Sequence, residues 1–137
     1  MPNAAGWLVS TVDDLWSFVR MIVEGGTSGS ERILSAASIE LMTTNHLTEH
    51  QRAGGAMFLG VNGGWGYGMR VPDAATRPHA TALTDGFGWD GGTGTMWRTS
   101  PVTGRTGILL TQRCMTSPEP PALFRDFAAS ADAMFED

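Results

Sequence analysis

Residues 86–113, which read GFGWDGGTGTMWRTSPVTGRTGILLTQR, decide the fold. This stretch contains short runs of β-branched and aromatic residues separated by glycine or proline, a pattern typical of antiparallel strands. It predicts strands at residues 84–90, 94–100 and 106–113. The PVTGR sequence at 101–105 is a tight connection, so the last two strands should form a hairpin.

Helical periodicity precedes this stretch. Apolar residues recur at helical spacing over residues 11–24 and form one stripe. Ser10 stands where an N-cap is expected, and the glycine pair at 25–26 should end the helix. A second, shorter helix is predicted after Ser35, ending near His46.

The remaining segments complete the pattern. Residues 48–64 are loop-like, and residues 65–71 predict a strand interrupted by glycines. The SPEPP sequence at 117–121 breaks the chain and opens a final amphipathic helix. The order of elements predicts an α+β fold, with helices packed on a mostly antiparallel sheet.

Composition excludes several classes of function. The chain has 137 residues, which suits one domain, and its net charge of -5 argues against nucleic-acid binding. No apolar run is long enough for a membrane helix and no leader pattern is visible, so we expect no membrane contact and a cytoplasmic location. All nine basic residues are arginines, which excludes any mechanism that needs a lysine amine, and no cofactor motif is present.

Other reactive residue types have simpler interpretations. His46 and His50 are four positions apart, but only two imidazoles are available at a helix end, so we predict a solvated loop and no metal site. Ser10 and Ser35 precede helical stripes and are predicted to be helix caps rather than nucleophiles. Cys114 has no evident activating partner and is predicted to be an ordinary thiol.

Four aromatic residues lie on or near the predicted strands: Trp65, Tyr67, Trp89 and Trp97. They are candidates for a platform that binds a sugar or an apolar acyl group. Aromatic residues at alternating strand positions are more often core or cross-strand pairs, and that interpretation is favoured. Tyr67 and Trp89 are the two that we expect near any pocket.

Several segments, taken in order, resemble the serine β-lactamase and penicillin-binding-protein-like hydrolases, including their esterase branch. AGWLVST at 5–11 looks like the start of a family helix, and GWGYG at 64–68 resembles the family's glycine-aromatic strand. FGWDGG at 87–92 falls where the family has its third motif, Lys-Thr-Gly or His-x-Gly, on the strand that lines the active site. The resemblance implies that residues 1–137 are a single partial domain, the C-terminal portion of a β-lactamase/transpeptidase-like fold.

The resemblance also implies a substrate strand. Trp89, Asp90, Gly91, Gly92 and Thr93 would lie beside the substrate, and the Gly92 N–H would be one of two oxyanion donors. The rival interpretation is a glycine-rich strand bent to pack beneath a tryptophan. Trp89 stands at the position of the family's Lys or His, which looks more like the esterase branch and makes β-lactam specificity doubtful.

Two family motifs are missing. A chain without lysine cannot contain the family's Ser-x-x-Lys nucleophile motif, and Tyr67 is followed by Gly-Met, so it is not the Tyr-x-Asn or Tyr-x-Ser motif. We therefore expect this chain to contain no catalytic residue. The parent reaction would be acyl transfer to a serine, followed by hydrolysis of an ester or amide. The alternatives are a non-catalytic module that binds a small apolar ligand or a partner chain, and a truncated reading frame without a function of its own.

The last predicted strand bears on association. The GILL sequence at 107–110 is continuously apolar, which predicts burial on both faces. In the family this strand is flanked by an N-terminal strand that the chain lacks, so its edge would be unpaired. An unprotected edge recruits another strand, and we therefore predict a homo-oligomer joined near Gly107 to Thr111.

Overall fold

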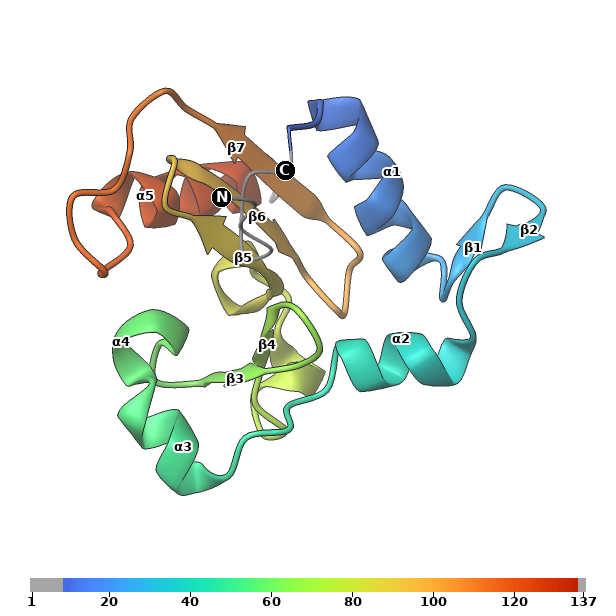
Figure 1. The fold of residues 1–137 in the computed structure, drawn as a ribbon, viewed down its shortest axis with the longest axis horizontal. Helices are drawn as coiled ribbons and strands as arrows, with labels where there is room; N and C mark the ends of the chain where they lie inside the picture. Colours follow the sequence, from blue (N-terminus) through green and yellow to red (C-terminus); the bar gives the residue numbers. More distant parts are fainter. Residues whose placement is uncertain (1–8, 136–137) are drawn as a thin grey trace, which may run out of the picture.

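A five-stranded antiparallel sheet organises the structure, and its strands neighbour one another in chain order (Figure 1). The computed structural model describes residues 9–135. The strands of the sheet are β3 (Gly63–Trp65), β4 (Arg70–Pro72), β5 (Phe87–Gly91), β6 (Thr95–Thr99) and β7 (Thr106–Leu110). Short turns join β3 to β4, β5 to β6 and β6 to β7, whereas residues 73–86 connect β4 to β5.

The register divides the sheet into two parts. Trp97 of β6 lies opposite Trp89 of β5 on one side and Ile108 of β7 on the other, and all five residues of β6 are paired with both neighbours. Only the pair Arg70–Gly88 joins β4 to β5. Strands β5, β6 and β7 therefore form a continuous unit, to which the β3–β4 hairpin is attached at one point.

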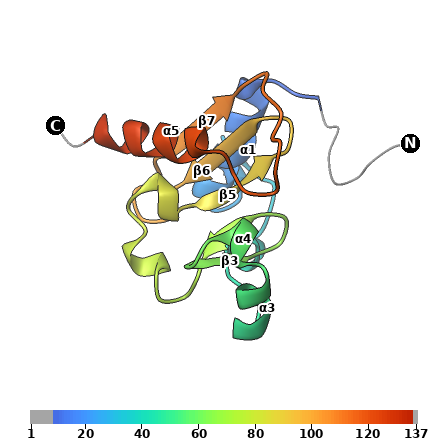
Figure 2. The ribbon, with the colours of Figure 1, turned by 90° about the vertical axis from the view of Figure 1, so that its left-hand side faces the viewer.

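Helices cover both faces of this unit. Phe18 of the first long helix contacts Trp97, whereas Phe127 of the C-terminal helix lies against Gly107. Trp97 is paired with Ile108, and Gly107 is the next residue along that strand. Because side chains alternate along a strand, Trp97 and Gly107 belong to opposite faces of the sheet. Figure 2 shows the C-terminal helix beside the strands in the upper half of the view and α3 at its lower end. The helical elements are α1 (Val12–Val23), α2 (Ala36–Met42), α3 (Glu49–Gly54), α4 (Ala56–Leu59), η1 (Arg77–His79), η2 (Leu83–Asp85) and α5 (Ala122–Ala133), and a small hairpin is formed by β1 (Thr27–Ser28) and β2 (Glu31–Arg32).

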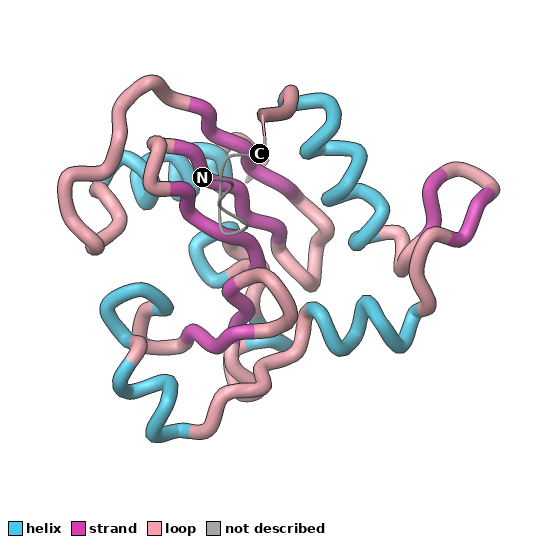
Figure 3. The backbone as a smooth tube through the Cα atoms, viewed as in Figure 1, coloured by secondary structure: helices cyan, strands magenta, loops and turns pink. Residues whose placement is uncertain are grey.

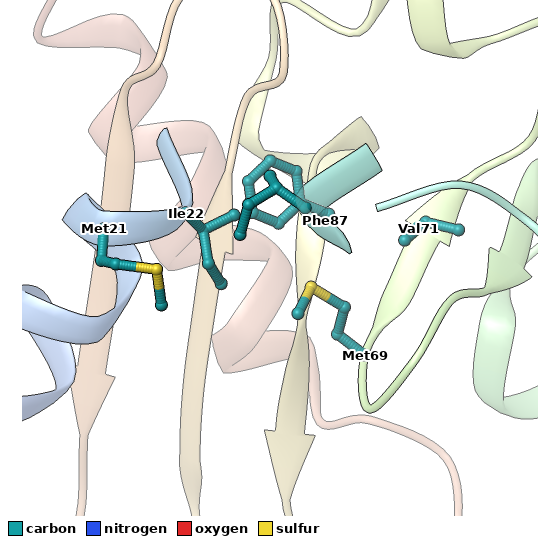
Figure 4. Packing of buried hydrophobic residues seen from close by; sticks show 6 residues of the cluster. Met21, Ile22, Met69, Val71 and Phe87 are labelled. Atoms are coloured by element: carbon teal, nitrogen blue, oxygen red, sulfur yellow. The ribbon is translucent and has the colours of Figure 1, made fainter. Parts of the chain in front are cut away.

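The main core lies on the α1 side of the sheet (Figure 4). Met21 and Ile22 from α1 pack there against Met69, Val71 and Phe87. Each of these side chains is at most 7% exposed, and burying a side chain of this size contributes roughly 1.5–3 kcal/mol. The core therefore joins α1 to both parts of the sheet.

Thr11, not Ser10, caps α1. The Thr11 hydroxyl accepts the backbone N–H of Asp14 at 3.1 Å, whereas the Ser10 hydroxyl only donates to the Asp14 carboxylate on the surface. The prediction for Ser10 was wrong by one residue, because both hydroxyls precede the same stripe and only the backbone angles select one. Ser35 caps α2 as predicted, with its hydroxyl 3.0 Å from the Ser38 N–H.

We expect Thr11→Ala to lower the free energy of unfolding by about 1 kcal/mol, because one N–H in the first turn of α1 loses its acceptor. Ser10→Ala is the matched control and should have a much smaller effect. Chemical denaturation followed by circular dichroism measures both. Equal losses in the two variants would contradict the assignment of the cap.

The segment predicted as a loop, residues 48–64, contains two short helices. Thr48 accepts the Gln51 N–H while the Gln51 side chain accepts the Thr48 N–H, a capping box that starts α3. The single strand predicted at residues 65–71 is a hairpin of β3 and β4. Gly68, with φ +89°, allows the turn between them, so the glycines reverse the chain instead of interrupting a strand.

Other boundaries also differ. The second helix ends at Met42 rather than near His46, and residues 83–85 form η2, so β5 begins at Phe87. The expectation that β7 is buried on both faces is wrong. Gly107 is buried, but Leu110 is 53% exposed, and β7 is the last strand in the order of the sheet.

Within residues 9–135, no helix has both the length and the apolar character needed to cross a bilayer.

Candidate functional site

The predicted substrate strand is the end of β5 and the turn that follows it. Trp89, Asp90 and Gly91 belong to β5, and Gly92 and Thr93 lie in the turn to β6. These five consecutive residues thus lie at one end of the β5–β6 hairpin, and their position beside a substrate stays a prediction.

Hydrogen bonds from the segment after β7 hold this turn in place. The Gly94 N–H donates to the Gly91 carbonyl at 2.9 Å, and the Gly94 carbonyl accepts the Thr111 hydroxyl at 2.7 Å. The Gly92 carbonyl accepts the Met115 N–H at 2.9 Å. A Cβ at Gly92 would meet no atom within 4 Å, so this side of the turn is open to an approaching group.

A cavity of about 450 Å³ lies beside the turn. Its wall includes Phe58 of α4, Trp89, Gly92 and two prolines of the loop between β7 and α5, Pro118 and Pro120. Figure 3 shows this loop as a long pink segment running from β7 to α5. The cavity is therefore mostly apolar, and Trp89 lines it as predicted.

The aromatic residues do not form one platform. Trp89 packs edge-to-face on Trp65, with ring centroids 4.5 Å apart. Trp97 packs in the same way on Phe87 at 5.9 Å, in the α1 core. Tyr67 stacks on His46 at 4.5 Å and is 57% exposed. The cross-strand interpretation thus holds for Trp65, Trp89 and Trp97, while a pocket role for Tyr67 stays a prediction.

A buried ion pair, which the sequence analysis missed, lies behind the turn. Arg98 Nη2 donates to Asp90 Oδ2 at 2.8 Å, with side chains only 10% and 7% exposed. The other carboxylate oxygen, Asp90 Oδ1, is buried without a hydrogen-bond partner. A signal for this pair existed, because a turn at residues 92–94 places positions 90 and 98 on the same face of neighbouring strands.

Arg70 adds a second buried cation on the same side. Its Nε donates to the Leu59 carbonyl at 2.8 Å and its Nη1 to the Gly86 carbonyl at 2.7 Å. Burial, and after it the positive charge of Arg98, lowers the pKa of Arg70 to about 10. The guanidinium is therefore still charged at neutral pH, and it fixes α4 to the start of β5.

The remaining candidates lie apart from this site. His46 Nε2 lies 2.7 Å from the Leu41 carbonyl, and His50 is in α3. Cys114 is exposed and unpaired in the loop after β7. Throughout residues 9–135, no three His, Cys, Asp or Glu side chains are grouped closely enough to hold a metal ion. The family-like segment at residues 5–11 falls mostly outside the described residues.

The antiparallel sheet with its flanking helices agrees with a β-lactamase-like domain. The Beta-lactamase family model matches residues 1–130, and the chain belongs to this family. Protein Rv1367c of Mycobacterium tuberculosis (strain ATCC 25618 / H37Rv) is 37% identical over 119 residues, which are 82% of this chain and 29% of the relative. Uncharacterized protein MT1414 of strain CDC 1551 / Oshkosh matches with the same identity and coverage. The chain thus spans less than a third of the length of these relatives.

Proposed function

We propose that this chain is the C-terminal, substrate-facing segment of a hydrolase that transfers an acyl group to a serine and then hydrolyses the acyl-enzyme. The observation that carries the proposal is the open backbone of Gly92 beside a mostly apolar cavity, in a chain that belongs to the Beta-lactamase family. An acyl-transfer site needs N–H groups aimed at the developing oxyanion, and an unobstructed glycine lets the substrate carbonyl approach closely.

Trp89 favours an uncharged ester as the substrate. At the family position of a Lys or His, it provides no cation for a substrate carboxylate. Its ring instead packs on Trp65 and forms part of the wall of the apolar cavity. A neutral ester with an apolar acyl or alkyl group suits this wall better than a β-lactam, whose carboxylate needs a partner.

The 137-residue chain is expected to be inactive alone, because it has no lysine to activate a serine and supplies only one candidate oxyanion donor. Without the rest of an active site, the cavity beside Gly92 would serve only to bind a small ligand or a partner chain. That is the alternative function, and the two are separated by whether activity can be restored.

The test combines the chain with the remainder of a relative such as Protein Rv1367c, expressed separately, and assays hydrolysis of p-nitrophenyl esters and nitrocefin. We expect neither part to act alone and the mixture to hydrolyse esters. Gly92→Pro should then lower kcat roughly 10²–10³-fold, because proline removes the N–H donor. Gly92→Ala is the matched control: it keeps the N–H, its Cβ meets nothing within 4 Å, and it should remain active.

Three results would contradict the proposal or the role that it gives to Gly92. Ester hydrolysis by the chain alone that is lost on changing one of its own serines would show a complete site here. A stable but inactive mixture that binds apolar esters would favour the binding module. Equal activity of Gly92→Pro and Gly92→Ala would remove Gly92 from the oxyanion role.

We also propose that the chain associates through β7. In the described part of the chain, β7 pairs only with β6, which leaves its other edge without a strand partner. Thr106–Leu110 carries no charge, so nothing on this edge repels a second copy. Light scattering at micromolar concentration should give a dimer mass or more, and Leu110→Lys should give a monomer, since Leu110 is exposed and the change spares the core. A monomer mass for the unmodified chain would contradict this proposal.

A further inference from the structure

A second and larger cavity lies between α4 and α5, on the opposite face of the sheet from the α1 core. Its volume is about 680 Å³. Met57 and Phe58 of α4 form one wall, and Met96 of β6 with Phe124 of α5 forms another. The guanidinium groups of Arg70 and Arg98 line it as well. Neither the β-lactamase-like reaction nor the turn at Gly92 gives this cavity a task.

The lining of this cavity contains more arginines than carboxylates. Arg70 is 7% exposed and Arg98 is 8% exposed, and one carboxylate, that of Asp90, faces them from the cavity lining. Arg125 and Glu119 also line the cavity, and their formal charges are equal and opposite. Among the residues that line this cavity, arginines therefore outnumber carboxylates by one, while Asp85 and Asp73 act on Arg70 from outside the lining.

Arg70 lines this cavity, and one of its guanidinium nitrogens takes no part in its backbone hydrogen bonds. Its Nε and Nη1 are used on the carbonyls of Leu59 and Gly86, and Nη2 makes neither bond. Nη2 lies 3.9 Å from the position that a Cβ on Gly60 would take, and Gly60 lines the same cavity. Asp85, the acidic group whose charge acts most on Arg70, does not line the cavity. An anion placed here would gain a charge-assisted hydrogen bond in an environment of low dielectric.

We propose that this cavity binds a small amphipathic carboxylate, with its carboxylate on the Nη2 group of Arg70 and its apolar chain between Met57, Phe58 and Phe124. The class of ligand follows from the two properties of the cavity. Its apolar walls select a hydrocarbon body, and its excess guanidinium charge selects a single anionic head. A cation would face two arginines, and an uncharged chain would leave Nη2 without an acceptor. Phe58, Asp90 and Pro120 line both this cavity and the one beside Gly92, so the two cavities adjoin. The proposed ligand does not depend on the acyl-transfer proposal.

Titration calorimetry of the 137-residue chain with sodium octanoate tests the proposal. We expect one octanoate per chain, bound at least tenfold more tightly than 1-octanol, which has the same chain without the charge. Acetate, which has the charge without the chain, should show no measurable binding. Equal affinities for octanoate and 1-octanol would overturn the role of the arginines, and no octanoate binding at millimolar concentration would overturn the site.

Variants at the exposed wall locate the ligand without disturbing the buried arginines. Met57 is 63% exposed, so Met57→Glu should leave the fold intact while placing a negative charge at the cavity. We expect Met57→Glu to weaken octanoate binding at least tenfold and Met57→Gln, its neutral match, to weaken it less than threefold. Unchanged binding in Met57→Glu would place the ligand elsewhere and overturn the proposal. Loss of octanoate binding when the remainder of a relative is added would show that polypeptide fills the cavity, and would overturn it for the longer protein.

Discussion

Gly88→Ala should lower the free energy of unfolding by at least about 3 kcal/mol. The loss comes from added steric strain, because the substitution removes no interaction. Gly88 has φ +149°, which side chains rarely adopt, and a Cβ there would overlap the backbone carbonyl of Trp97 in the next strand. The clash is with backbone, so no side-chain rotation relieves it. Gly88 is also the residue that pairs β5 with Arg70 of β4, so its displacement separates the two parts of the sheet.

Chemical denaturation measures this loss, and Gly92→Ala in the same hairpin is the control. A Cβ at Gly92 has open space around it, so that variant should stay within about 0.5 kcal/mol of the unmodified chain. Similar midpoints for Gly88→Ala and the unmodified chain would show that β5 does not adopt this conformation in solution.

Arg98→Ala should cost about 3–5 kcal/mol, because it leaves the Asp90 carboxylate buried with no partner. Arg98 supplies the hydrogen bond to Asp90 Oδ2, and Oδ1 has no partner even in the intact pair. At 7% exposure the Asp90 side chain cannot exchange the lost bond for full hydration. The cost comes from the uncompensated carboxylate rather than from the strength of the original bond.

The double variant Asp90→Leu with Arg98→Met separates these two explanations. Replacing both charges with apolar groups should recover most of the stability, because no buried charge is left. Arg20→Ala is a second control, since the Arg20–Glu24 pair is exposed and its loss should cost less than about 1 kcal/mol. A double variant as unstable as Arg98→Ala would show that packing, and not charge, dominates at this position.

Local patterns predicted α1, α2, α5 and the last hairpin of the sheet. The apolar stripe that begins near Val12 and stops at the glycine pair gave the bounds of α1 to within a residue or two. The tight connection at residues 101–105 predicted the hairpin of β6 and β7, and the structure contains it. The order of the motifs also identified the Beta-lactamase family, which the match over residues 1–130 confirms.

The predictions for the cap of α1 and for the strand at residues 65–71 were wrong because the local sequence is compatible with more than one structure. Two hydroxyls precede α1, and only backbone geometry makes Thr11 the cap. The glycines at 66 and 68 are compatible with an interrupted strand or with a turn. Close contact decides between them, because a Cβ at Gly66 would overlap the carbonyl of Met42, a residue of α2. A segment 24 positions away in the chain thus selected the hairpin.

By itself, the sequence determined the α+β order, the hairpin at residues 101–105 and the absence of any lysine-dependent chemistry in this chain, because each of these depends on residue types and spacings within a few positions. Tertiary structure alone decided the pairing of Asp90 with Arg98, the anchoring of Arg70 on the carbonyls of Leu59 and Gly86, and the two cavities beside α4. The physical reason is that burial turns a charged side chain from a solvated surface group into one that must find a partner. Which partner it finds depends on the strands and helices that the folded chain brings alongside.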